Sequence, residues 1–150
     1  MRFLIQRVSE ASVKVDQNVT GQIMNGLLVF VGVSANDSTE TADRMIEKLL
    51  KLRIFEDAAG KTNCSLNDVG GEILLISQFT LYADCRKGNR PSFTNAGPAQ
   101  AANFLYEYIL GQIASKGISV QHGVFGAHME VSLNNHGPFT IWLDSEELFG

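Results

Sequence analysis

An apolar run that ends abruptly in polar residues is the feature that most constrains the fold of this chain. Residues 73–76 follow the pair Gly70-Gly71 and have the composition of a strand buried in a core. Ser77, Gln78 and Thr80 come immediately afterwards. Buried polar groups are unfavourable unless they find hydrogen-bond partners. The segment therefore predicts either a strand end whose side chains bond neighbouring backbone, or the floor of a site.

Short segments of alternating apolar and polar residues predict a β-rich fold around this strand. Residues 2–8 and 11–16 alternate and are separated by only two residues, which predicts a hairpin. Residues 19–24 form a weaker strand, and Asn25-Gly26 is a typical hairpin turn leading into an apolar strand at 27–33. Three further short strands are predicted toward the C-terminus, at 118–123, 129–133 and 139–143.

Two segments carry the periodicity of amphipathic helices. The first begins after the capping residues at 37–39 and buries one stripe, and the second begins at Pro98 and ends at Gly117. No repeat, linker or low-complexity tract divides the chain. The prediction is therefore a single α+β domain over residues 1–150, a barrel-like, curved, mostly antiparallel sheet with two amphipathic helices packed on it.

Composition and charge narrow the possible functions. Hydrophobic residues make up 45% and charged residues 19%, as in ordinary soluble domains, and no stretch approaches the ~20 apolar residues of a membrane span. The first residues lack the apolar core of a signal peptide, so we expect a cytoplasmic protein with no membrane partner. The net charge of −4 disfavours binding of nucleic acid through a global positive field, but it allows a local basic patch.

Several familiar site chemistries lack their usual motifs. The histidines His122, His128 and His136 do not have metal-ligand spacing, and no C-x-x-C, G-x-G-x-x-G or P-loop occurs, so we expect neither a metal nor a cofactor. Two cysteines, Cys64 and Cys85, are too few for a disulfide framework and are expected to be dispensable thiols. A pair of Cys85 with a histidine and a serine triad both stay open, although no G-x-S-x-G elbow is present.

A second informative stretch spans residues 134–140. Gly137-Pro138 is interpreted either as an ordinary turn between two strands or as a shaped loop, because glycine lets backbone approach a ligand closely. A cis bond before Pro138 would mark the second case, since only ~5–6% of X–Pro bonds in folded proteins are cis. Residues 84–98, with two glycines and two prolines, are predicted to form a long functional loop.

The segments SQFTLYAD at 77–84 and NHGPFT at 135–140 resemble the two signature motifs of the D-aminoacyl-tRNA deacylases. The similarity extends through the opening MRFLIQRVSEASVKV and through the segments at 52–57, 68–84, 86–93 and 125–140. His128 and His136 are departures, because an acidic residue is expected there in many members. These departures concern substrate preference and not the resemblance itself.

The resemblance implies a homodimeric, cytoplasmic esterase that cleaves the bond between a D-amino acid, or glycine, and the 3′ end of tRNA. It implies a catalytic floor made of Ser77, Gln78, Phe79 and Thr80. It also implies that a Gly137-Pro138 pair in the cis form enters the pocket of the partner subunit and blocks L-amino acids. The other substrate-binding residues implied are Asn135, Thr140, Met129 and Phe125.

The chemistry of an aminoacyl ester is consistent with such a site. The ester is already activated, so backbone N–H groups near Phe79 could stabilise the carbonyl oxygen as it gains charge while Thr80 positions the groups. Arg86, Lys87 and Arg90 are candidate contacts to tRNA phosphates. Two rival functions stay open, a non-catalytic RNA- or protein-binding β-domain and a small-ester hydrolase with a serine or cysteine nucleophile.

Overall fold

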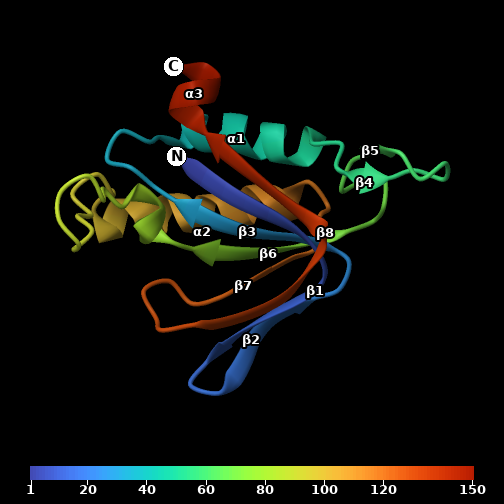
Figure 1. Cartoon of the computed structure of the whole chain (residues 1–150), viewed down its shortest axis with the longest axis horizontal. Helices are drawn as coiled ribbons and strands as arrows, with labels where there is room; N and C mark the ends of the chain where they lie inside the picture. Colours follow the sequence, from blue (N-terminus) through green and yellow to red (C-terminus); the bar gives the residue numbers. More distant parts are fainter.

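A strongly curved six-stranded sheet dominates the fold in the computed structural model, which describes residues 1–150 (Figure 1). The strand order is β2-β1-β3-β6-β7, and β8 pairs with the free side of β1. A separate two-stranded sheet contains β4 (Phe55–Glu56) and β5 (Thr62–Cys64). The strands of the main sheet are β1 (Arg2–Val15), β2 (Asn18–Ile23), β3 (Gly26–Gly32), β6 (Glu72–Ser77), β7 (Val120–His122) and β8 (Glu130–Asp144).

The barrel-like, curved sheet that the sequence predicts is confirmed, but the sheet is mixed. β1 runs antiparallel to β2, β3 and β8, whereas β6 runs parallel to both β3 and β7. Parallel neighbours need a long crossover, usually a helix. Here α1 (Thr39–Lys51) lies between β3 and β6 in the chain, and α2 (Ala99–Ser115) lies between β6 and β7.

Both predicted helices are present, and a third is added. Ser38 caps α1, where its Oγ accepts a hydrogen bond from the N–H of Thr41 at 3.2 Å. α2 follows Pro98 as predicted. The third helix, α3 (Ser145–Phe149), is not predicted from the sequence, and its first turn is capped by Asp144. Five residues are too few to show a helical period.

Two predicted hairpin turns are wrong, and the two strands predicted on either side of residues 134–138 form one strand. β1 continues through residues 9–10, and the hairpin turn follows at Asp16 and Gln17, both with positive φ. Asn25-Gly26 joins β2 to β3, but both strands pair with β1 and not with each other. Residues 134–138 lie inside β8. Within that strand the Gly137–Pro138 bond is cis.

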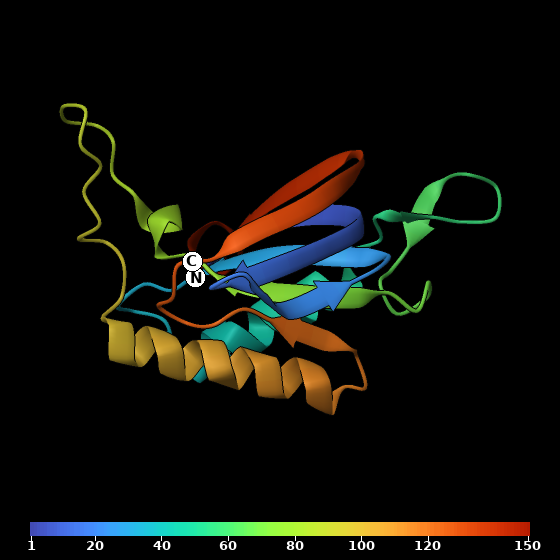
Figure 2. The same cartoon turned by 90° about the horizontal axis from the view of Figure 1, so that it is seen from below.

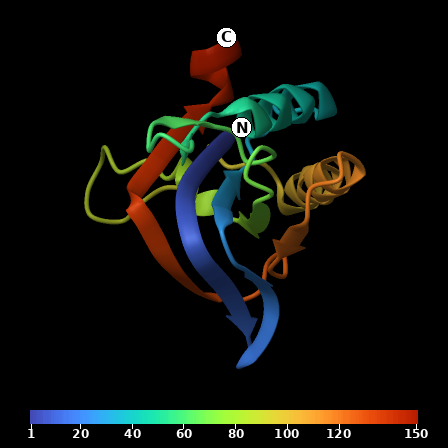
Figure 3. The ribbon, with the colours of Figure 1, turned by 90° about the vertical axis from the view of Figure 1, so that its right-hand side faces the viewer.

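Two apolar cores lie on the two faces of the sheet. The larger has 23 buried residues between the sheet and the helices α1 and α2, which both cover one face (Figure 3). The smaller has seven buried residues inside the curve formed by β1, β2, β3 and β6. The chain ends lie close together, since the N–H of Ser145 donates to the carbonyl of Met1 at 2.9 Å. None of the helices has the length and apolar character needed to span a membrane.

Candidate active site

A cleft of about 490 Å³ opens at the carboxyl ends of the parallel strands β3 and β6. In sheets with parallel strands this edge is where ligands usually bind. Eleven of its fifteen lining residues are hydrophobic. Ser77 and Gln78 lie on the floor, where the apolar strand ends, and Phe125 and Met129 line it from the segment between β7 and β8. Five residues predicted from the sequence therefore meet in one cleft, because Phe79 lines it too.

The change from strand to helix at the end of β6 shapes the floor. The N–H of Gln78 still donates to the carbonyl of Val31 at 2.7 Å, and the chain then tightens into the short 3₁₀ helix η1 (Phe79–Tyr82). The side-chain amide of Gln78 donates to Oγ1 of Thr80 at 2.6 Å. The first N–H groups of a helix have no acceptor inside it. The arrangement thus places an amide, a hydroxyl and strand-end N–H groups beside an apolar cavity.

Tyr106 of α2 forms the back of the cleft and was missed by the sequence analysis. Its buried hydroxyl donates to the carbonyl of Leu75 at 2.7 Å, and its ring centroid lies 6.0 Å from that of Phe125. Burial raises the pKa of the Tyr106 phenol, so the hydroxyl stays a neutral donor. Tyr106 thereby fixes β6 two residues before the floor begins.

The second motif forms a bulge in β8 opposite β1. Gln6 pairs with Thr140 and Val8 with Asn135, so β1 advances two residues while β8 advances five. Asn135 closes the bulge with two hydrogen bonds, from its side-chain amide to Oγ1 of Thr140 at 3.0 Å and to its Oδ1 from the N–H of Phe139 at 2.9 Å. Gly137 and Pro138 lie exposed at the tip.

Arg7 holds this bulge from beneath. Its Nε donates to the carbonyl of His136 at 2.9 Å, and its buried NH1 donates to the carbonyl of Ile54 at 2.7 Å. The guanidinium carbon lies 4.7 Å from the ring centroid of Phe139. The signal in the sequence was an arginine on the same alternating face as Phe3 and Ile5. A charged residue on the apolar face of a strand indicates a buried side chain that bonds other polar groups.

The cleft and the bulge do not meet within one chain. β1 and β3 lie between β8 and β6 in the sheet, so Asn135, Gly137, Pro138 and Thr140 lie across the sheet from Ser77 and Gln78. None of the four lines the cleft, and neither does Thr80 directly. The bulge is thus an exposed element, held by hydrogen bonds from Arg7 and Asn135 and separated from the cleft of its own chain.

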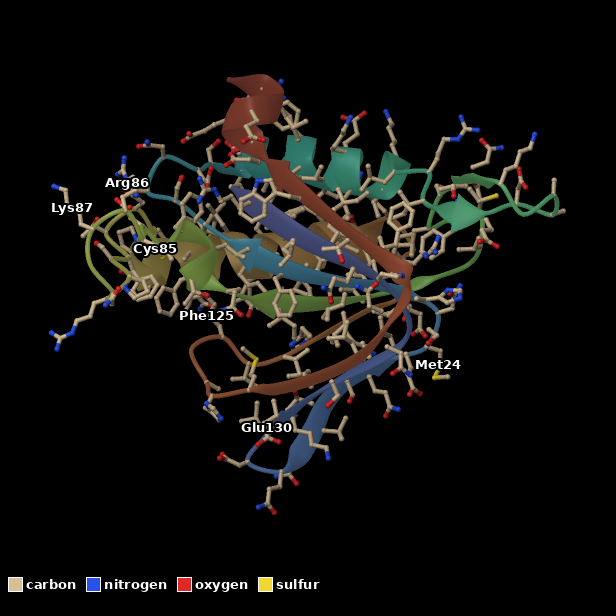
Figure 4. All side chains as sticks on the ribbon, viewed as in Figure 1. Met24, Cys85, Arg86, Lys87, Phe125 and Glu130 are labelled. Atoms are coloured by element: carbon tan, nitrogen blue, oxygen red, sulfur yellow. The ribbon has the colours of Figure 1, made fainter.

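The loop after η1 carries the basic residues predicted to contact RNA. It projects from the body of the molecule (Figure 2), and Arg86 and Lys87 lie at the same end as Phe125 (Figure 4). The guanidinium of Arg86 bonds both carboxylate oxygens of Asp84, at 2.9 and 2.6 Å, and holds the Asp84 pKa at about 2. Lys87 and Arg90 are exposed and form no ion pair.

The histidines and cysteines are dispersed over the structure. His128 and His136 are exposed, and Nδ1 of His122 lies 2.6 Å from the carbonyl oxygen of Gly123. Three or more His, Cys, Asp or Glu side chains nowhere gather in a group that could hold a metal ion. Cys64 is half-buried and Cys85 exposed, and both are free. No hydrogen bond joins Cys85 to a histidine.

Comparison with known proteins gives one consistent result. The family model for D-Tyr-tRNA(Tyr) deacylase matches residues 4–144. The D-aminoacyl-tRNA deacylase of Clostridioides difficile is 54% identical over 99% of this chain and 100% of its own length. That of Thermotoga petrophila is 52% identical over the same shares of the two chains.

Solved structures agree with the fold. A structure described as the c-Myc DNA Unwinding Element Binding Protein superposes with a TM-score of 0.90 and 38% identity, covering 96% of this chain and 98% of that one. A probable eukaryotic D-amino acid tRNA deacylase reaches a TM-score of 0.84 at 16% identity over 95% and 97% of the two chains, which supports the fold alone.

The curved mixed sheet and the polar-floored cleft, in a chain this similar to deacylases, define a hydrolase of the deacylase class. The chain belongs to the D-Tyr-tRNA(Tyr) deacylase family.

Proposed function

We propose that the protein hydrolyses the ester bond between a D-amino acid, or glycine, and the 3′ end of tRNA, and that it spares L-aminoacyl-tRNA. This would be a proofreading step in the cytoplasm that returns mischarged tRNA to use. The observation that carries the proposal is the polar floor of an otherwise apolar cleft, built by Ser77 and Gln78 where β6 ends. Family membership supports the same substrate.

The floor suits an ester that needs little activation. The carbonyl oxygen of the substrate gains negative charge during attack, and each well-placed N–H donor lowers the barrier by roughly 3–4 kcal/mol. The strand-end N–H groups at Phe79 fill this role in our proposal. Thr80 is held by the amide of Gln78 and positions the reacting groups, while water or a terminal hydroxyl of the RNA attacks. No cofactor takes part.

A second copy of the chain is proposed to complete each site. Gly137 and Pro138 are exposed, firmly held by Arg7 and Asn135, and two strands away from their own cleft. An isologous dimer would carry each bulge to the cleft of the partner, where its backbone excludes an L side chain by contact. An apolar row supports such a dimer, since Leu4 pairs with both Phe30 and Trp142, and Trp142 is 41% exposed.

The basic loop is proposed to contact the tRNA backbone. Lys87 and Arg90 are exposed and unpaired, so they are the stronger phosphate ligands. Arg86 is a weaker one because Asp84 already holds its guanidinium. The net charge of −4 confines RNA binding to such local patches.

The two rival functions have less support. A small-ester hydrolase with a cysteine nucleophile needs a base, and Cys85 has no hydrogen bond to a histidine. A purely binding domain would not need a polar strand end beside an apolar cleft. Neither rival accounts for a bulge held rigidly at an exposed tip.

The proposal is tested with two variants in one assay. Gln78→Ala damages the floor and Gly137→Ala damages the bulge, so each homodimer should release free amino acid from D-aminoacyl-tRNA slowly. A mixed dimer should recover activity, because an intact cleft then meets an intact bulge from its partner. Mixed dimers as inactive as the parents would contradict the shared site. Wild-type protein that releases no D-amino acid would contradict the proposed function itself.

A further inference from the structure

Two exposed aromatic side chains stand at the mouth of the cleft. Phe79 is 57% and Phe93 38% exposed, and both line the cavity. Their ring centroids lie 5.1 Å apart with the planes at 74°, an edge-to-face pair. Such a pair leaves ring faces open to solvent. Large apolar groups held open beside a binding cleft indicate a contact with something outside the protein.

The backbone around Phe93 is fixed, although the loop has no helix or strand. Asp84 and Ser92 exchange two backbone hydrogen bonds at 2.7 and 2.9 Å. These bonds close residues 85–91, the basic tip, into a separate loop. After Phe93, its carbonyl accepts from Ala96 at 3.0 Å, and the N–H of Gly97 donates to Val33 at 2.8 Å. Phe93 is therefore presented in a prepared position, which lowers the entropy lost on binding.

Charge in the same loop identifies the kind of partner. Lys87 and Arg90 lie on the tip between the two bridge residues, exposed and without acidic partners. Asp84, the acidic residue nearest in the chain, is neutralised by Arg86. Open aromatic faces beside unpaired cations are the arrangement that binds single-stranded nucleic acid, where bases stack and phosphates meet cations.

We propose that Phe93, supported by Phe79, stacks on the unpaired base that precedes the terminal adenosine of the tRNA. The inference rests on the proposed function, which places the ester at the floor near Ser77 and the terminal adenosine within the cleft of about 490 Å³. The chain of the RNA then leaves through the mouth, where Phe93 meets the penultimate nucleotide. The tip with Lys87 and Arg90 meets the phosphates that follow.

The test uses a series of D-tyrosyl esters that differ in the length of their RNA. The esters are carried by adenosine alone, by CA, by CCA and by whole tRNA. For the wild type, kcat/KM should rise when the penultimate cytidine is added. In Phe93→Leu the ratio of kcat/KM for the CA ester to that for the adenosine ester should fall about 10-fold, as expected for loss of a base stack. Phe93→Trp should restore it.

Two controls make the reading specific. Phe104→Leu removes another aromatic ring, 63% exposed on α2 but outside the cleft, and should leave the ratio unchanged. A tRNA with an abasic penultimate position should lower wild-type kcat/KM to the level of Phe93→Leu and should not lower the variant further.

Three results overturn the inference. One is an equal loss by Phe93→Leu on the adenosine and CA esters, which would make Phe93 a wall of the cleft. Another is dissociation of Phe93→Leu to monomers in light scattering, which would make Phe93 a contact between subunits. The third is a wild-type ratio that does not change with the cytidine. Hydrolysis of the D-tyrosyl ester of whole tRNA by the wild type tests the proposed function separately, and its absence overturns both.

Discussion

Arg7 shows at the scale of one residue how a charged group becomes part of a core. The side chain of Arg7 is buried, and its guanidinium donates hydrogen bonds to the backbone carbonyl oxygens of His136 and Ile54. These buried polar groups therefore all have partners. A Cβ added at Gly137, whose φ is +141°, would come within 2.9 Å of the NH2 of Arg7. Arg7 and the small residue at 137 thus fit each other, and together they set the shape of the exposed tip.

Arg7→Lys should destabilise the protein and slow deacylation. A single ammonium cannot bond two carbonyls in the fork geometry of a guanidinium, so one buried oxygen loses its donor. We expect the free energy of unfolding to fall by about 2 kcal/mol, measured by urea denaturation. Arg44→Lys, an exposed change on α1, is the control and should have little effect. Full stability and rate in Arg7→Lys would show that the bulge does not depend on this contact.

At the scale of elements, the sequence predicted where strands lie better than where they turn. The strand breaks predicted at 9–10 and 134–138 have one cause, because the irregular parts of β1 and β8 face each other. In β1, Arg7 and Val8 are both buried and Ser9 and Glu10 both exposed, so the alternation changes phase without a reversal of the chain. A bulge and a tight turn both interrupt the alternation of apolar and polar residues. Only the strand that pairs with the segment distinguishes one from the other.

The residues of the candidate site likewise differ in whether the local sequence predicts them or only the tertiary structure reveals them. Ser77 and Gln78 were predictable because polar residues ended an apolar strand. The residues Phe125 and Met129 came from the family resemblance, and both do line the cleft. Tyr106 was not predictable, because its place in the helical stripe indicates only burial. Its bond to the carbonyl of Leu75 depends on how α2 lies against β6.

Tyr106→Phe tests how α2 fixes the floor. Loss of the hydroxyl should lower the free energy of unfolding by about 1 kcal/mol at pH 7. Burial raises the phenol pKa of Tyr106 and Tyr82 in the folded state, whereas unfolded tyrosine ionises near pH ~10. The contribution of these neutral phenols to the free energy of unfolding is therefore fully present below pH ~10 and is lost as the pH rises toward the raised pKa values.

The gap in the free energy of unfolding between wild type and Tyr106→Phe should consequently narrow at alkaline pH, since the variant has one buried phenol fewer. Urea denaturation at pH 7 and again above pH ~10 measures it. A gap of the same size at both values would mean that the Tyr106 hydroxyl ionises as easily in the folded protein as in the unfolded chain.

At the scale of the whole molecule, the curved sheet separates two parts that our proposal requires to act together. The cleft lies at the ends of β3 and β6, and the Gly137-Pro138 tip lies across the sheet on β8. In a dimer, the tip of one subunit would reach the cleft of the other. Light scattering should therefore give about twice the 16.4 kDa of one chain. An active monomer would remove the reason to assign the tip a role in the site.

The central claim is that this protein removes D-amino acids from tRNA and spares L-amino acids. The most direct measurement is the ratio of single-turnover hydrolysis rates for D-tyrosyl- and L-tyrosyl-tRNA on one tRNA, with wild type and Gly137→Ala side by side. Our account predicts rapid hydrolysis of the D-ester by the wild type, an intact L-ester, and a large fall in D-turnover or in the ratio for Gly137→Ala. Equal wild-type rates for the two isomers, or a variant with both rates unchanged, would contradict it.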